Sequence, residues 1–206
     1  MQGLRRSNSP AILLLEDGTV FEGKALGASG TSVGEIAFNT GMYGYQEIFT
    51  DPSYHKQMLV MATPHIGNYG VHDEEVESKG IKVAGIIVRN FSTIASRVGG
   101  SGTLQDNLEA SGTVGISDVD TRALVRHIRT NGAMNCILST EEFDVDKLKK
   151  QLSEVPSMEG LALSGEVSVS EAYDFNEIGE GHRIALLDLG LKRSIASCLA
   201  ERGCDI

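Results

Sequence analysis

The chain has 206 residues, with 18 basic and 28 acidic side chains, so its formal net charge is −10 at pH 7. Hydrophobic residues make up 41% and charged residues 22%, which is typical of a folded soluble protein and excludes a disordered one. This length allows one large domain, or one domain and part of another. The acidic balance argues against nucleic acid as a partner, because phosphate repels a chain of this charge.

The composition indicates a protein of a reducing compartment. The first apolar run, residues 11–15, is shorter than a signal peptide or a membrane span requires. The three cysteines are odd in number and lack metal-ligand spacing, which indicates free thiols. We therefore expect a cytoplasmic protein with no membrane partner.

The first part of the chain predicts short strands separated by turns. Residues 12–15 and 19–24 flank a Glu-Asp-Gly turn, which indicates a hairpin with Gly18 in a left-handed conformation. Further strands are expected at four β-rich or apolar runs: residues 33–39, 57–63, 83–90 and 136–138.

Three helices are expected in the same part. Residues 103–110 form a weak helical pattern that Gly112 ends. A clearer helix is capped by Asp120 and ends at Gly132, and another is capped by Asp144. Apolar residues at helical spacing form the inward faces of these two: Leu124, Val125 and Ile128 in the first, and Val145, Leu148 and Leu152 in the second.

The last fifty residues are organised differently. Residues 156–181 are polar or small without sustained periodicity, and we interpret them as a connector. Residues 182–190 have the form of a buried parallel strand, residues 192–201 that of a helix, and residues 204–206 begin another strand. A lone βα unit cannot cover both faces of its strand, so we expect the opening of a truncated parallel-sheet domain. The predicted boundaries are 10–155 for the first domain, 156–181 for the connector and 182–206 for the start of the second.

No cysteine is predicted to be a catalytic nucleophile. Cys136 lies in an apolar strand, where burial is expected, Cys198 lies inside a helix, and Cys204 follows its cap. The histidines never pair at metal-ligand spacing and no C-x-x-C occurs, so no metal is expected. Asp118 and Asp120 precede a helix, which favours capping over cation binding.

Other polar stretches have simple interpretations. The glycine-rich residues 27–34 and 99–102 lack the strand–helix context of a phosphate-binding loop and predict turns. The acidic run 73–77 is interpreted as a solvated loop. The outer face of the clearest helix carries three arginines that face either solvent or an acidic partner: Arg122, Arg126 and Arg129.

One segment is richer in polar, glycine and aromatic residues than a generic turn. Residues 38–54 join two predicted strands, and residues 64–70 follow the second of these with a similar density. Within the first segment, Asp51-Pro52 is a turn signature that would hold the Ser53 hydroxyl at a fixed place. Spacing alone leaves two interpretations open: a binding loop, or tight turns that only satisfy their own backbone.

Ordered motifs along residues 11–206 resemble the small chain of carbamoyl phosphate synthase. The matching runs include Gly44-Tyr45-Gln46-Glu47, Thr50-Asp51-Pro52-Ser53-Tyr54, Pro64-His65-Ile66-Gly67-Asn68, Asp118-Val119-Asp120-Thr121-Arg122, Arg129-Thr130-Asn131-Gly132-Ala133 and Leu187-Asp188-Leu189-Gly190-Leu191-Lys192-Arg193. Because several motifs occur in the same order at similar spacings, the resemblance is specific.

The resemblance implies a mixed α/β fold: a three-layer β/β/α domain of the swivelling type, then the first βα unit of a class I glutamine amidotransferase domain. It implies that the small chain hydrolyses glutamine and passes ammonia to a large subunit in a heterodimer. The large subunit uses ATP, Mg²⁺ and bicarbonate to make carbamoyl phosphate for arginine and pyrimidine synthesis. No cofactor is expected in this chain.

The resemblance also implies which functional residues are present. The family's Cys–His–Glu triad has no counterpart in these residues, and Cys198 and Cys204 match no part of its Gly-x-Cys-x-Gly elbow. Ser53 is the one position that carries over, and it is implied to contact bound glutamine and orient it without proton transfer. We expect this chain alone to be inactive as a glutaminase and to serve as the domain that contacts the large subunit.

Two alternatives belong to other classes. The chain could be a standalone swivelling-domain scaffold or docking module without enzymatic role. A phosphotransfer swivelling domain would need a catalytic histidine in a glycine-rich loop. His65 is the only candidate, and Pro64 before it with Ile-Gly-Asn after it favours the family's turn.

Overall fold

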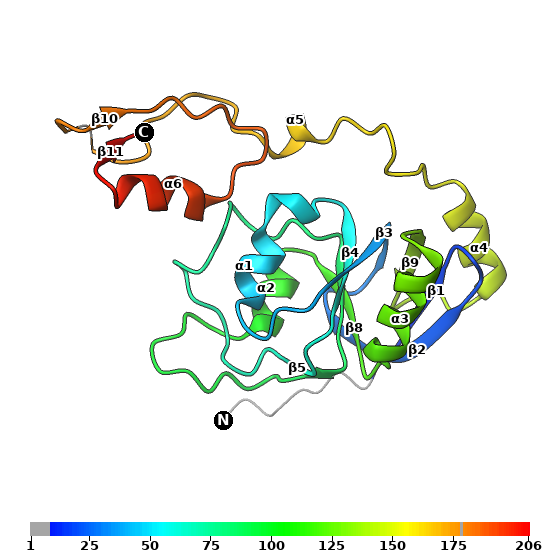
Figure 1. The fold of residues 1–206 in the computed structure, drawn as a ribbon. Coiled ribbons are helices and arrows are strands. Elements are labelled where there is room, and N and C mark those ends of the chain that lie inside the picture. Colours follow the sequence, from blue (N-terminus) through cyan, green and yellow to red (C-terminus); the bar gives the residue numbers. More distant parts are fainter. Residues whose placement is uncertain (1–8, 178) are drawn as a thin grey trace.

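The computed structural model describes residues 9–177 and 179–206 (Figure 1). Its strands are β1 (Pro10–Leu15), β2 (Val20–Gly27), β3 (Thr31–Asn39), β4 (Gln57–Met61), β5 (His65–Ile66), β6 (Gly85–Ile87), β7 (Asn90–Phe91), β8 (Val114–Ser117), β9 (Asn135–Ser139), β10 (His182–Arg183) and β11 (Cys204–Asp205). Its helices are α1 (Tyr45–Thr50), the 3₁₀ helix η1 (Pro52–Tyr54), α2 (Leu104–Ala110), α3 (Thr121–Asn131), α4 (Val145–Ser153), α5 (Ser164–Val167) and α6 (Arg193–Ala200). None of the helices in the described ranges is both long and apolar enough to cross a bilayer.

A closed barrel of mixed strand direction forms the main body. Its strand order is β1-β2-β8-β6-β4-β3-β9. The neighbours β3, β4, β6 and β8 run parallel to one another, whereas β1, β2 and β9 pair antiparallel. The expected mixed α/β class is confirmed, and the sheet closes into a barrel. The finer three-layer swivelling description stays a prediction.

The period of two in the strands divides the apolar residues between the barrel interior and the covering helices. Leu13, Ile36 and Met58 belong to the interior cluster, which α3 completes with Leu124 and Ile128. The opposite faces of β4 and β6 pack against α1 and α2, and Ile12 and Leu14 pack against Leu148 and Leu152 of α4. Strand β1 is therefore buried on both faces, which explains its unbroken apolar run.

Local signals in the sequence are borne out along the barrel. Gly18 adopts a φ of +88° in the β1–β2 hairpin, as the turn signature predicts. Asp120 accepts a hydrogen bond from the backbone N–H of Ala123, and Asp144 accepts from those of Asp146 and Lys147, so both predicted caps are confirmed. The turn predicted over residues 27–34 is confirmed only for residues 28–30, between β2 and β3, and is wrong for residues 31–34, which belong to strand β3.

The end of the chain agrees with its prediction only in part. Strands β10 and β11 pair in parallel around α6, so the βα unit forms. However, the predicted buried strand over residues 182–190 is wrong. Only His182 and Arg183 are extended in a ladder, and Leu187 is 83% exposed, because no described element covers the run that follows. The connector contains the short helix α5, and the domain boundaries stay predictions.

Candidate functional site

The Ser53 turn is built by a cap at its first residue. Helix α1 ends at Asp51, and Asp51 then caps η1, its Oδ1 accepting a hydrogen bond of 2.9 Å from the backbone N–H of Ser53. Pro52 at the first helical position fixes the backbone angle. Ser53 is exposed, and its hydroxyl finds no hydrogen-bond partner among the described residues. The predicted turn is confirmed, and it leaves this hydroxyl available.

Buried side chains hold the turn from below. Tyr45 and Phe49 of α1 are almost fully buried, and the Tyr54 hydroxyl accepts a hydrogen bond of 3.0 Å from the Asn39 amide at the end of β3. The Thr50 hydroxyl oxygen accepts a hydrogen bond of 2.9 Å from the backbone N–H of Glu77. The turn therefore sits on the rigid barrel.

The Asp51 carboxylate also binds the end of the chain. Its Oδ2 lies 2.6 Å from Nζ of Lys192, the residue that precedes α6. The Asp51 side chain is only 8% exposed, whereas that of Lys192 is 40% exposed. The hydrogen bond to Asp51 raises the pKa of the Lys192 ammonium, outweighing its partial burial. One carboxylate thus joins the Ser53 backbone to residues of the βα unit.

The glycine turn before Lys192 packs directly on Pro52. Asp188 Oδ1 accepts hydrogen bonds from the backbone N–H groups of Gly190 (2.7 Å) and Leu191 (2.6 Å). Gly190 has a φ of +103°, and a Cβ there would lie 3.4 Å from the Pro52 Cβ and 2.9 Å from the Val167 side chain. Glycine is therefore required by both conformation and space.

Glu77 supplies the N-terminal hydrogen bonds of α6 from a distant segment. Its carbonyl oxygen accepts from the Arg193 N–H (2.8 Å), and its Oε2 accepts from the Ser194 N–H (2.9 Å). These amides have no partner within the helix, so the contact satisfies them and places a negative charge at the positive end of the helix dipole. The interpretation of residues 73–77 as a merely solvated loop is wrong for Glu77. It is also wrong for Glu75, which pairs with Arg97 at 2.5 Å.

A third contact attaches the connector to the same region. Glu166 of α5 accepts a hydrogen bond of 2.7 Å from Nζ of Lys56, and its other oxygen lies 3.2 Å from Nε2 of His55. The hydrogen bonds from Lys56 and then His55 lower the pKa of Glu166. Figure 1 shows α6 beside the end of the barrel that carries α1. Helix α5 lies in the connecting segment between α4 and the βα unit. Three polar contacts therefore hold residues 166–194 against the Ser53 side of the barrel.

The thiols do not form a nucleophilic site in the described residues. Cys136 is buried in β9, its Sγ lies 3.4 Å from the Gly34 carbonyl oxygen, and burial raises the pKa of its thiol. Cys198 is exposed on α6 and Cys204 is half-buried. Over residues 9–177 and 179–206, no three His, Cys, Asp or Glu side chains gather in a way that could hold a metal.

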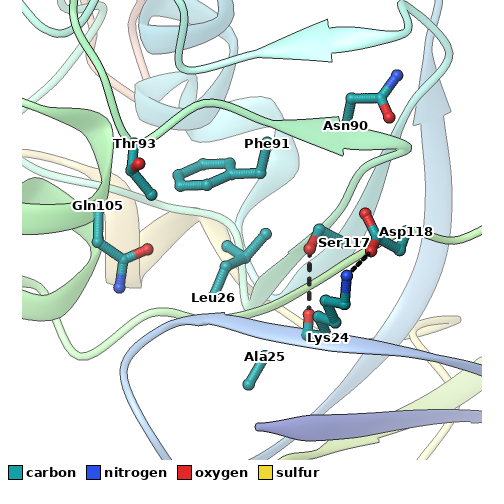
Figure 2. Close-up of a pocket in the computed structure, with 9 residues that line it drawn as sticks. All are labelled: Lys24, Ala25, Leu26, Asn90, Phe91, Thr93, Gln105, Ser117 and Asp118. Atoms are coloured by element: carbon teal, nitrogen blue, oxygen red, sulfur yellow. Dashed lines mark hydrogen bonds and ion pairs between the residues drawn. The ribbon is translucent and has the colours of Figure 1, made fainter. Parts of the chain in front are cut away.

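A separate pocket, which sequence reasoning missed, lies where β2, β7, β8 and α2 meet. Figure 2 shows Phe91 and Leu26 between Gln105 on one side and the Lys24–Asp118 ion pair, of 2.6 Å, on the other. The Gln105 amide exchanges hydrogen bonds with Gly27 and donates to Glu109. Several of the polar groups that line this pocket therefore already bind other groups of the chain, which makes it a weaker candidate than the Ser53 turn.

Comparison with known proteins assigns the barrel to a class. Residues 13–138, which run from β1 to β9, match the family described as carbamoyl-phosphate synthase small chain, CPSase domain. The barrel is thus a CPSase domain, and the chain belongs to the carbamoyl phosphate synthase small chain family.

Relatives extend the similarity beyond the barrel. The chain is 45% identical over 201 residues to the carbamoyl phosphate synthase small chain of Streptomyces coelicolor, covering 96% of this chain and 53% of that protein. It is 40% identical to that of Thioalkalivibrio sulfidiphilus, covering 96% of this chain and 56% of that protein. For Vibrio cholerae the identity is 41%, with 94% and 55% covered. The chain spans about half the length of the curated relatives it matches, and the resemblance deduced from its motifs is confirmed.

Proposed function

We propose that the chain is the N-terminal part of the amidotransferase subunit of a glutamine-hydrolysing carbamoyl phosphate synthase. In this proposal the complete subunit hydrolyses glutamine and passes ammonia to the large subunit, which uses ATP and bicarbonate. The barrel is the swivelling-type domain that contacts the large subunit, in the cytoplasm and in the service of arginine or pyrimidine synthesis. Family membership supports the proposal.

The two contacts of the Asp51 carboxylate are the observation that supports a glutamine-binding role for Ser53. Asp51 binds both the Ser53 N–H and Lys192, so the turn of one unit and the Gly190 turn of the other are fixed side by side. A hydroxyl held there can donate to or accept from a polar ligand lying between the two units. In this proposal Ser53 orients glutamine without transferring a proton, because no base hydrogen-bonds its hydroxyl among the described residues.

Activity requires more than these residues contain. Glutamine hydrolysis by a class I amidotransferase needs a thiolate activated by a positioned base. Cys136 is buried with a raised thiol pKa, and neither Cys198 nor Cys204 lies in a nucleophile elbow. We expect the 206-residue chain to release no ammonia from glutamine. Release of ammonia from glutamine by the purified chain, abolished by alkylation of its thiols, would contradict this expectation.

The role of Ser53 is tested by Ser53→Ala in a chain that carries the complete glutaminase domain. Loss of a hydrogen bond to the ligand raises the KM for glutamine by about tenfold, and kcat changes less, because the serine binds without reacting. Ser101→Ala, at another exposed serine, leaves both constants unchanged. An unchanged KM in Ser53→Ala would remove Ser53 from the glutamine site.

A further inference from the structure

Two loops beside α1 expose large apolar side chains to solvent. Met42 and Tyr43, between β3 and α1, are each 82% exposed. Ile94 and Val98, after β7, are 58% and 97% exposed. We call residues 40–44 and 92–100 the two-loop surface. Apolar groups gathered at such exposure mark interaction sites, and Tyr and Met are enriched in the centres of protein interfaces.

The first loop is held rigidly by Tyr69. The Tyr69 hydroxyl accepts hydrogen bonds from the backbone N–H groups of Gly44 (2.8 Å) and Tyr45 (3.1 Å). The Tyr69 and Tyr45 rings stack with their centroids 4.1 Å apart. At the other end, Asn39 Oδ1 accepts from the N–H of Gly41 at 2.6 Å. The exposure of Met42 and Tyr43 is thus imposed by a fixed backbone.

The second loop is attached to Asn68, the residue that precedes Tyr69. The Asn68 carbonyl oxygen accepts hydrogen bonds from the N–H of Ser96 (3.0 Å) and from its hydroxyl (2.7 Å). Arg97, between Ile94 and Val98, pairs with Glu75. Because Asn68 and Tyr69 are consecutive, the two loops lie next to each other. Loops held in this way lose little conformational entropy on binding, which favours docking.

Acidic side chains border the two-loop surface. Glu47 lies one turn into α1 from Gly44, Glu75 holds Arg97, and Asp73 and Glu74 are exposed beside it. Burial raises the pKa of the Glu47 carboxyl, and repulsion from Glu75 and Glu77 adds to this effect. The rim is therefore negative, on a chain with a net charge of −10.

We propose that the two-loop surface docks on a different protein, in a groove that is apolar at its centre and basic at its rim. A second copy of this chain would oppose one acidic rim with another, and like charges across an interface are unfavourable. An anionic lipid or nucleic acid would be repelled for the same reason. The identity of the partner rests on the proposed function, which makes it the large synthase subunit.

The test measures the affinity of the 206-residue chain for the cognate large subunit. In the double variant Tyr43→Ser/Val98→Ser, which replaces one anchor in each loop, Kd rises at least about tenfold. Leu187→Ser removes an equally exposed leucine from a different segment and leaves Kd unchanged. Glu74→Lys weakens binding and lowers its salt dependence, since it removes attraction to a basic rim. Thermal melting confirms that each variant is folded.

Hydrogen exchange separates the possible outcomes. With the wild-type complex, the inference expects protection at residues 40–44 and 92–100. If the large subunit binds the wild type and the double variant equally and neither loop gains protection, the two-loop surface is not the docking site while the proposed function stands. If the wild-type chain does not bind the large subunit at all, the proposed partner fails and the docking inference fails with it. Self-association that the double variant abolishes would assign the surface to a second copy and overturn the inference.

Discussion

Replacing Lys192 with methionine removes the ion pair that joins the βα unit to the Ser53 turn. Exposed ion pairs contribute about 0–1 kcal/mol, whereas removing one partner of a buried pair costs about 3–5 kcal/mol. The Lys192 side chain is 40% exposed and that of Asp51 only 8%, and Asp51 keeps its hydrogen bond from the Ser53 N–H. The expected cost therefore lies between these limits, at about 1–2 kcal/mol.

The cost should appear as local opening of α6. Its first amides, Arg193 and Ser194, are protected by Glu77 only while the unit stays against the barrel. A loss of about 1–2 kcal/mol makes their hydrogen exchange about 5–30 times faster in Lys192→Met. Lys147→Met, on α4, breaks an exposed pair with Glu142, which precedes that helix, and leaves the exchange of α6 unchanged. Equal exchange at Arg193 in the wild type and Lys192→Met would refute the role of the bridge.

The same pair has a defined pH window. Pairing with Asp51 raises the pKa of Lys192 in the folded chain. Its contribution is therefore complete below the unfolded pKa of lysine, about 10.4, and is lost as the pH rises through the folded value. After correction for the intrinsic base catalysis of amide exchange, the protection of α6 should fall as the pH rises through the folded Lys192 pKa in the wild type and should not do so in Lys192→Met.

Three further outcomes are expected. Gly23→Ala would place a Cβ 2.2 Å from the Ser117 carbonyl oxygen, so chemical denaturation should show a free energy of unfolding lower by about 1–3 kcal/mol. Gly165→Ala is the control: it has open space around its Cβ and should change that free energy by less than about 0.5 kcal/mol. Asp120→Ala removes the cap of α3 and should cost about 1 kcal/mol, and a variant as stable as the wild type would contradict the cap. The hydrogen bond from Lys56 lowers the pKa of Glu166. The stabilisation that Glu166 gives to the contact between α5 and the barrel is therefore present above the unfolded pKa of glutamate, about 4.3, and is lost as the pH falls through the folded value. Carbon NMR of the Glu166 carboxyl should show a higher pKa in Lys56→Met than in the wild type.

Sequence reasoning succeeded where short-range chemistry decides the structure. The Gly18 hairpin and the Asp120 cap depend on a few neighbouring residues, and both form as predicted. Helix α1 was missed because it has six residues, begins after Gly44 at a φ of +77°, and carries no side-chain cap. Strand β8 was missed because its four residues include Gly115 and acquire their burial from distant strands.

The candidate site could be predicted only as a turn. Asp51-Pro52 identified the place of Ser53, and the structure confirms that turn. The contacts that make it a meeting point, from Asp51 to Lys192 and from Glu77 to Ser194, join residues far apart in the chain and follow no local pattern. For the same reason, the apolar run that contains Leu187 predicted burial although nothing in the described chain covers it.

Sedimentation velocity of the 206-residue chain mixed with the cognate large synthase subunit tests the central claim most directly. The account predicts a one-to-one complex that sediments faster than either component, with no ammonia released when glutamine is added. Separate sedimentation of the two proteins at every concentration, with both folded, would contradict the claim that this chain is the docking part of the amidotransferase subunit.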